Sequence, residues 1–190
     1  MQQISVATSN EQKFGIAKHV LMTFSIAAKR IRIDIDEIQG EDAEIIVRDK
    51  AQKAFKAFGK PIAVTDDSWS IPALNGFPGP YMKSMNHWFT PEDFIRLMHG
   101  KTDRTIYIHQ YVAYHDGTHI QVFHNDIAGV VVHKPRGNFG PSVMHIAAME
   151  GDDGLTISEA YDQGSRHDEA RRANPNDAWR QLGGWLRERT

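Results

Sequence analysis

The chain has 190 residues, enough for one domain or for one domain with a small lobe. Its 22 basic and 24 acidic residues give a net charge of −2, so no basic excess indicates a nucleic-acid partner, and the lack of cysteine excludes disulfides and thiolate metal sites. No charged segment precedes a long apolar run, and no apolar run approaches ~18 residues, so we expect a cytoplasmic protein without a membrane partner.

The chain begins with the pattern of a strand, a short polar loop and a helix. Residues 4–8 favour a strand, and Ser9 and Asn10 can cap the helix that follows. The expected apolar face of that helix is formed by Phe14, Ala17, Val20, Leu21 and Phe24. Backbone N–H groups at a helix start favour an anion, and Lys13 could add a positive charge. This pattern fits a generic βα unit as well as it fits a phosphate site.

A second strand and a strong helix follow. Residues 30–36 alternate strictly and predict a strand with one buried face, and residues 37–41 predict a turn. A helix is expected from Asp42 or Glu44 to Phe58, with a buried stripe made of Val47, Ala51, Ala54, Phe55 and Phe58. Three lysines lie off this stripe: Lys50, Lys53 and Lys56. Such lysines usually form a solvated face, although one of them could reach back to a phosphate.

Residues 61–68 read as a buried strand that runs directly into two carboxylates and a hydroxyl. Because adjacent strand residues point to opposite faces, Asp66 and Asp67 can share one direction only if the strand ends there. Strand ends are where α/β proteins place ligand chemistry, and paired carboxylates suit Mg²⁺ or Mn²⁺. The alternative is a plain turn after a strand.

The remaining elements are predicted from turn and periodicity signals. In chain order we expect a structured loop at 70–81, a helix from Thr90 to about His99, strands at 105–114 and 119–123 joined at Asp116-Gly117, a further strand at 127–132, a short element at 155–160 and an amphipathic helix at 176–187. The loop at 134–141 carries Arg136 and Phe139, which could stack on a nucleotide or could belong to an ordinary turn.

Five stretches, in this order along the chain, are similar to the motifs of one family. They are Thr8-Ser9-Asn10-Glu11-Gln12-Lys13 (T-G-N-x-x-K), Glu37-Ile38-Gln39-Gly40-Glu41 (E-x-Q-G-E), Lys50-Ala51 (K-A), the block from Asp66-Asp67-Ser68 through Ala73-Leu74-Asn75-Gly76 to Tyr81 (D-D-S…A-L-N-G-x-P-G-x-Y), and Pro135-Arg136-Gly137 (P-R-G). The chain therefore resembles the inosine/xanthosine triphosphate pyrophosphatase family, which is Ham1-like and hydrolyses non-standard purine nucleoside triphosphates between the α- and β-phosphates.

The resemblance implies an α/β fold with an elongated mixed β-sheet and flanking helices. It implies a single ITPase-like domain over residues 1–190, with two lobes, a central cleft and assembly into a homodimer. It also implies a nucleoside triphosphate substrate and Mg²⁺ as the cofactor, with Mn²⁺ as the alternative ion.

Three groups of site residues are expected, partly from the resemblance and partly from the residue types. The catalytic group is Asp67, Asp66 and Lys13. The substrate-binding group is Thr8, Ser9, Asn10, Lys13, Lys50, Ser68, Arg136, Phe139, Arg166 and His167. The metal ligands are Glu37 and Asp67, and a carboxylate beside them would orient or deprotonate the attacking water.

The chain departs from the family pattern where the family reads the base. After Phe139 the family continues G-[YW]-D-P, whereas residues 140–144 here read Gly-Pro-Ser-Val-Met. The later E-K-N-x-x-S-H-R stretch is altered at 162–169, where Arg166 and His167 either substitute for the missing groups or are surface charges. Trp69 also replaces a glycine. We therefore expect Mg²⁺-dependent hydrolysis to a nucleoside monophosphate and pyrophosphate with altered base preference. The alternative is a catalytically impaired nucleotide-binding or sensing protein of the same family.

Overall fold

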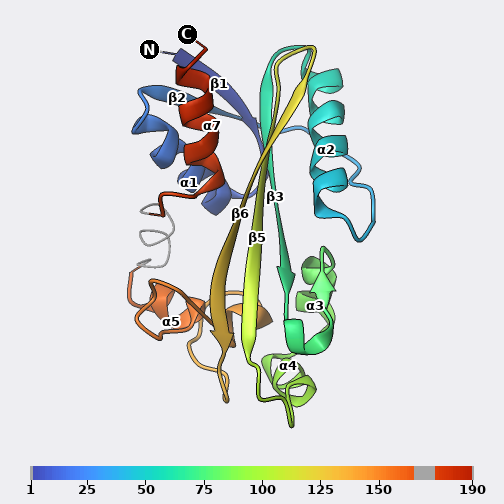
Figure 1. Ribbon diagram of the computed structural model, residues 1–190, viewed down its shortest axis with the longest axis vertical. Helices are drawn as coiled ribbons and strands as arrows, with labels where there is room; N and C mark the ends of the chain where they lie inside the picture. Colours follow the sequence, from blue (N-terminus) through green and yellow to red (C-terminus); the bar gives the residue numbers. More distant parts are fainter. Residues whose placement is uncertain (1, 165–173, 190) are drawn as a thin grey trace. The chain divides into compact units, whose positions relative to one another are not determined.

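A computed structural model describes residues 2–164 and 174–189 (Figure 1). The chain divides into two compact units: unit 1 contains Met1–Asp67, Gln110–Asn125 and Asn174–Thr190, and unit 2 contains Ser68–His109 and Asp126–Ala173. The strands are β1 (Gln2–Ala7), β2 (Ile26–Ile31), β3 (Ile62–Ser70), β4 (Pro78–Gly79), β5 (Thr105–His115), β6 (Ile120–Val131) and β7 (Ala147–Met149). The α-helices are α1 (Glu11–Met22), α2 (Ala43–Phe58), α3 (Met82–Trp88), α4 (Pro91–Leu97), α5 (Ile157–Asp162) and α7 (Ala178–Arg187), with 3₁₀ turns η1 (Pro72–Leu74) and η2 (Ser142–His145).

The strands form one mixed sheet in the order β2-β1-β3-β5-β6-β7, and β4 pairs with β3. β1 runs parallel to both β2 and β3, whereas the β3–β4 and β6–β7 pairs are antiparallel. The predicted mixed α/β sheet with flanking helices is therefore confirmed. Within residues 2–164 and 174–189, no helix combines the length and the apolar character that crossing a membrane requires.

In unit 1, side-chain alternation along β3 separates two hydrophobic cores. Ala63 packs with buried residues of α1 and α7, whereas Ile62 and Val64 pack with buried residues of α2. Because successive strand residues face opposite sides of a sheet, α1 and α7 cover one face and α2 covers the other (Figure 1). This two-sided arrangement determines which helix each polar residue of β3 can reach.

The ends of α2 follow the chemistry predicted from the sequence. The Asp42 side chain caps the start by accepting hydrogen bonds from the Glu44 and Ile45 N–H groups at 2.8 and 3.1 Å. At the other end Gly59 adopts a left-handed conformation with φ 72°, and its N–H donates to the Phe55 carbonyl at 2.7 Å. The helix over residues 43–58 is thus confirmed.

Two sequence-based expectations about strands are wrong. The strand expected over 30–36 is β2 at Ile26–Ile31, because β1 ends where Ala7 pairs with Ile31 and offers no partner further along. The apolar residues beyond it, Ile33 and Ile35, still pack against the α2 core. The expected separate strands 119–123 and 127–132 are one continuous strand, β6, joined to β5 by the predicted turn, in which the Asp116 N–H donates to the His119 carbonyl.

Unit 2 has its own core. Trp69 of β3, Ile106 and Ile108 of β5, and Ile127 of β6 pack against buried side chains of α3, α4, η2 and α5. The short helices begin with strong caps: Thr90 and Thr156 each form a capping box with the acidic residue three positions later.

Candidate active site

The carboxyl ends of β1 and β2 lie in register with each other and with Val64 inside β3. Ala7 at the end of β1 pairs with Ile31 at the end of β2 and with Val64 of β3. The segments after Ala7 and Ile31 therefore leave the sheet at one edge, whereas β3 continues past Val64 to Ser70, and open α/β sheets bind ligands at that edge. The motif residues after β1, after β2 and along β3 are brought together in this way.

The turn between β1 and α1 presents backbone N–H groups at a helix start. The Asn10 side chain accepts a hydrogen bond from the Lys13 N–H at 3.0 Å, and the Thr8 hydroxyl accepts one from the Asn10 N–H at 3.1 Å. Ser9 is exposed between them. These contacts fix the first turn of a 12-residue helix whose positive end can receive an anion.

Asp66 and Asp67 do not mark the end of a strand, contrary to the prediction. β3 continues to Ser70, so the two side chains point to opposite faces of the sheet. Asp67 lies on the α1 face, where its Oδ2 is 3.4 Å from Lys13 Nζ. Asp66 lies on the α2 face, where its Oδ1 is 3.8 Å from Lys50 Nζ. The adjacent carboxylates thus meet ammonium groups from two helices.

Glu37 is brought to the same cluster by the segment that follows β2. Lys50 Nζ lies 2.6 Å from Glu37 Oε1, so Lys50 links Glu37 and Asp66. One turn along α2, Lys53 donates to the Asp36 carbonyl at 2.7 Å and pairs with Asp49 at 2.8 Å. Lys53 therefore holds the segment that carries Glu37, a role that the sequence analysis missed although residues 50 and 53 share a helix face.

The electrostatic surroundings of Asp66 are unusual for a carboxylate. Burial raises the pKa of Asp66 above its ordinary value, and the charges of Lys13 and Lys50 oppose this shift. The negative charges of Asp67 and Glu37, like burial, raise the pKa of Asp66. The cluster holds three carboxylates and two ammonium groups. It suits a ligand that brings a cation for the carboxylates and an anion for the lysines.

The loop with Arg136 and Phe139 belongs to unit 2 and is anchored on α5. The Arg136 guanidinium donates to the Gly154 carbonyl at 2.6 Å and lies 3.2 Å from Glu159 Oε2. The Phe139 ring stacks on Tyr161 with centroids 4.8 Å apart, and Phe139 remains 41% exposed. The contact with Tyr161 therefore holds the exposed Phe139 ring in a fixed position on this loop.

Other predicted substrate-binding residues are placed differently. Ser68 is buried, with 5% of its surface exposed. Arg166 and His167 lie outside the described residues. The segment after Phe139 is built into unit 2: Ser142 donates to the Phe89 carbonyl at 2.5 Å, and the Val143 N–H donates to the Asn86 side chain at 3.0 Å.

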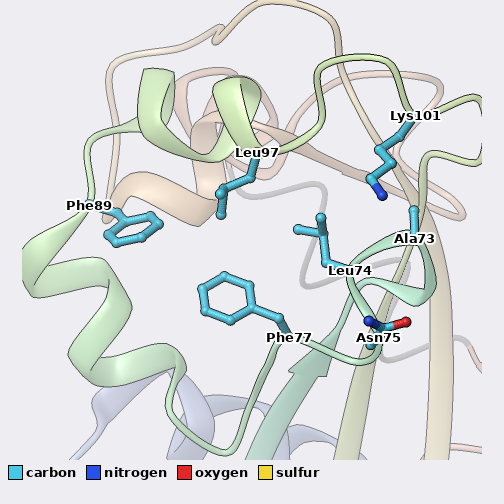
Figure 2. Close-up of a pocket in the computed structure, with 7 residues that line it drawn as sticks. All are labelled: Ala73, Leu74, Asn75, Phe77, Phe89, Leu97 and Lys101. Carbon is cyan, nitrogen blue, oxygen red and sulfur yellow. The ribbon is translucent and has the colours of Figure 1, made fainter.

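A pocket of about 380 Å³ lies elsewhere in unit 2 (Figure 2). Its lining is mostly apolar and consists of Ala73, Leu74, Asn75, Phe77, Phe89, Leu97 and Lys101. None of these residues belongs to the predicted catalytic, substrate-binding or metal groups. The pocket therefore shares no residue with the charged cluster.

Comparison with known proteins gives consistent matches over most of the chain. The model of the Ham1 family matches residues 4–162. A dITP/XTP pyrophosphatase of Saccharolobus solfataricus is 30% identical over 171 residues, covering 90% of this chain and 89% of that protein. One from Methanopyrus kandleri is 31% identical over 152 residues, covering 80% and 81%. The solved Ham1 protein of Staphylococcus aureus superimposes with a TM-score of 0.77 at 20% identity, covering 100% of both chains, and the HAM1 protein of Coxiella burnetii with 0.76 at 22%, covering 99% of this chain and 100% of that one.

Proposed function

The chain belongs to the Ham1 family, and on that premise we propose that it hydrolyses non-standard purine nucleoside triphosphates to the nucleoside monophosphate and pyrophosphate. The observation that carries this proposal is the cluster of Lys13, Lys50, Glu37, Asp66 and Asp67 at the carboxyl edge of the parallel strands. A triphosphate carries about four negative charges, so its cleavage requires cations on the phosphates and a positioned water.

The phosphates would be bound by the start of α1 and by the two lysines. The N–H groups of the first helical turn supply donors, and Thr8, Ser9 and Asn10 surround them. Lys13 and Lys50 approach the cluster from opposite faces of the sheet, so their ammonium groups can contact different phosphates. Their present carboxylate partners would then be released to a divalent cation.

Glu37 and Asp67 would bind Mg²⁺, with Mn²⁺ as the alternative ion. The donor set fits a hard cation, because it consists of carboxylate oxygens and contains neither thiolate nor imidazole. When bound, the ion would neutralise charge on the phosphates and polarise the bond to be cleaved.

Asp66 is the best candidate to accept a proton from the attacking water. Its raised pKa makes its carboxylate a stronger base than an exposed aspartate. Lys50 and Lys13 hold charge of opposite sign near it, which keeps the ionised form available. Lys13 and Asp67 complete the catalytic group by fixing the phosphates and the cation.

The base would be read with weak discrimination. Phe139, with Tyr161 stacked on it, supplies an aromatic face for any base. Where the family carries a second aromatic residue and an aspartate after Phe139-Gly140, this chain has Pro141 and Ser142, and the Ser142 hydroxyl donates to the Phe89 carbonyl within unit 2. A site that lacks polar groups for the base loses most of its selectivity.

The direct test is incubation with inosine, xanthosine, guanosine and adenosine triphosphates and their deoxy forms, with Mg²⁺ or Mn²⁺, and measurement of pyrophosphate. We expect release from the inosine and xanthosine nucleotides and, because the base is read with weak discrimination, also from the guanosine and adenosine nucleotides. If the protein is instead a nucleotide sensor, calorimetry should show nucleotide binding without turnover. Absence of pyrophosphate release from every nucleotide would reject the enzymatic proposal.

We also propose that the protein is a homodimer that acts in the cytoplasm, where nucleoside triphosphates are made and consumed. Exposed apolar side chains of unit 2, Tyr81, Trp88 and Leu97, support an interface on that unit. Light scattering coupled to gel filtration measures the oligomeric state, and cell fractionation measures the compartment.

A further inference from the structure

Three polar side chains form a hydrogen-bonded row across neighbouring strands of unit 2. Ser70 lies on β3, His109 on β5 and Asp126 on β6, and these strands are adjacent in the sheet in that order. Ser70 Oγ is 2.7 Å from His109 Nε2, and His109 Nδ1 is 2.5 Å from Asp126 Oδ1. None of the three belongs to the nucleotide or metal groups described above.

The partners of His109 determine which ring nitrogen accepts a hydrogen bond. An ionised carboxylate only accepts hydrogen bonds, so Asp126 requires a proton on Nδ1 of His109. In the neutral ring with this tautomer Nε2 is an acceptor, and the Ser70 hydroxyl donates to it at 2.7 Å. A hydroxyl, a base within hydrogen-bond reach and a third group that orients the base are the parts of an activated nucleophile.

The row is accessible from solvent. Trp69, Ile108 and Ile127 point into the hydrophobic core of unit 2, so the residues next to them in sequence, Ser70, His109 and Asp126, lie on the opposite face of the sheet. The side chains of His109 and Asp126 are 23% and 48% exposed, respectively. A small electrophile can therefore approach the hydroxyl of Ser70 without displacing the core.

We propose that Ser70 is an activated nucleophile that accepts acyl groups from small activated esters, with His109 as its general base and Asp126 as the group that orients His109. Ser70 Oγ forms a bond to the carbonyl carbon while its proton passes to His109 Nε2. The carbon–oxygen bond to the leaving group then breaks, and the alcohol departs with the proton from His109. Water then attacks the acyl carbon while His109 takes a proton from the water. His109 gives that proton to Ser70 Oγ as the acid departs, which restores the hydroxyl.

The row differs from the pyrophosphatase site in both chemistry and residues. The proposal does not depend on the nucleotide reaction, because it needs no divalent cation and uses none of the residues assigned to phosphate binding. The two activities can therefore be measured separately on the same preparation.

The test uses the whole protein in EDTA with a fluorophosphonate probe, in which Ser70 Oγ would displace fluoride from phosphorus while His109 takes the proton. Peptide mass spectrometry measures the labelling rate at Ser70 and at Ser84, a half-buried serine of α3 that serves as the internal control. We expect labelling at Ser70 to exceed labelling at Ser84. We expect His109→Gln to lower the rate by about a hundredfold and Asp126→Asn to lower it as well. Hydrolysis of p-nitrophenyl acetate should decline in parallel.

Nucleotide hydrolysis by Ser70→Ala serves as a measure of folding, and we expect it to stay within about twofold of the wild-type rate. If a variant fails to fold, the proposal is tested by the wild-type protein alone, through the labelling rate of Ser70 compared with that of Ser84. Labelling of Ser70 no faster than that of Ser84 would overturn the proposal, and so would equal labelling in a folded His109→Gln variant. Either result would leave the row as a set of cross-strand hydrogen bonds.

Discussion

Asp66 and Asp67 are consecutive residues of one strand, yet their carboxylates pair with lysines from helices on opposite faces of the sheet. Asp67 lies 3.4 Å from Lys13 of α1, and Asp66 lies 3.8 Å from Lys50 of α2. The alternation of a strand that continues past the two residues produces this separation. One short stretch of β3 thereby connects the ammonium groups of two helices to one group of carboxylates.

Replacing Lys13 with alanine is expected to lower kcat/KM for the nucleoside triphosphate by about 10² to 10³-fold, the usual cost of removing one donor that stabilises developing negative charge. Steady-state pyrophosphate release measures the effect. Lys18→Ala is the matched control, because Lys18 is an exposed lysine of the same helix. Equal activity of the two variants would show that Lys13 does not contact the phosphates.

The pKa of Asp66 leads to a prediction about stability. Burial raises this pKa above 3.8, so the charged side chain is disfavoured in the folded protein at neutral pH. The stabilising contribution of Asp66 is complete below the unfolded pKa and is lost as the pH rises through the folded pKa. We therefore expect Asp66→Asn to raise Tm at pH 7, with a gain that shrinks toward zero as the pH falls to 3.8.

Thermal unfolding monitored by circular dichroism at a series of pH values measures the difference in Tm between Asp66→Asn and the wild type. A lower Tm of the variant at pH 7 would show that the attraction of Lys13 and Lys50 exceeds the cost of burial, contrary to the direction of the pKa shift.

Lys53→Ala should weaken cation binding although Lys53 is not a proposed ligand. Lys53 donates to the Asp36 carbonyl and so positions the next residue, Glu37. Loss of an interaction that orients a metal ligand typically lowers metal affinity by about 10- to 100-fold. The Mg²⁺ concentration for half-maximal activity should rise accordingly. Lys56→Ala, at an exposed position of the same helix, should leave it unchanged, and identical Mg²⁺ curves for the two variants would contradict the assigned role.

Gly137 has no room for a side chain. An added Cβ would lie 2.4 Å from Ser158 Oγ, and φ is +84°, a conformation that other residues rarely adopt. Gly137→Ala should therefore lower stability by about 1–3 kcal/mol, and each kcal/mol corresponds to roughly 2–4 °C in Tm for a chain of this size. Gly15 lies inside α1, where an added Cβ meets no atom within 4 Å. Gly15→Ala should therefore raise stability by about 0.5–1 kcal/mol, because alanine loses less conformational entropy in a helix than glycine. An unchanged Tm of Gly137→Ala would show that the loop shifts without cost.

Local signals in the sequence predicted the elements with clear ends. The Asp42 cap and the Gly59 stop defined α2 to within a residue, because capping chemistry depends on a few neighbouring side chains. The alternation at 30–36 led to a wrong strand prediction. A strand also requires a pairing partner, and pairing with β1 ends at Ile31. Pairing partners are a property of the tertiary structure and cannot be read from periodicity alone.

The charged cluster was predictable through motifs, and its geometry was not. Lys13, Glu37, Lys50 and the two aspartates were named from their family positions, but nothing in the sequence indicated that β3 continues through Asp67. The row of Ser70, His109 and Asp126 was missed for a different reason. Its members lie on three strands, and only the strand order brings them together.

The proposed reaction of the charged cluster is cleavage of a nucleoside triphosphate between the α- and β-phosphates. The most direct measurement is product analysis after reaction of inosine triphosphate with Mg²⁺, for the wild type and for Asp67→Asn. We expect inosine monophosphate and pyrophosphate in equal amounts from the wild type, and a rate at least about a hundredfold lower for the variant. Release of orthophosphate and inosine diphosphate, or equal rates for the two proteins, would contradict it.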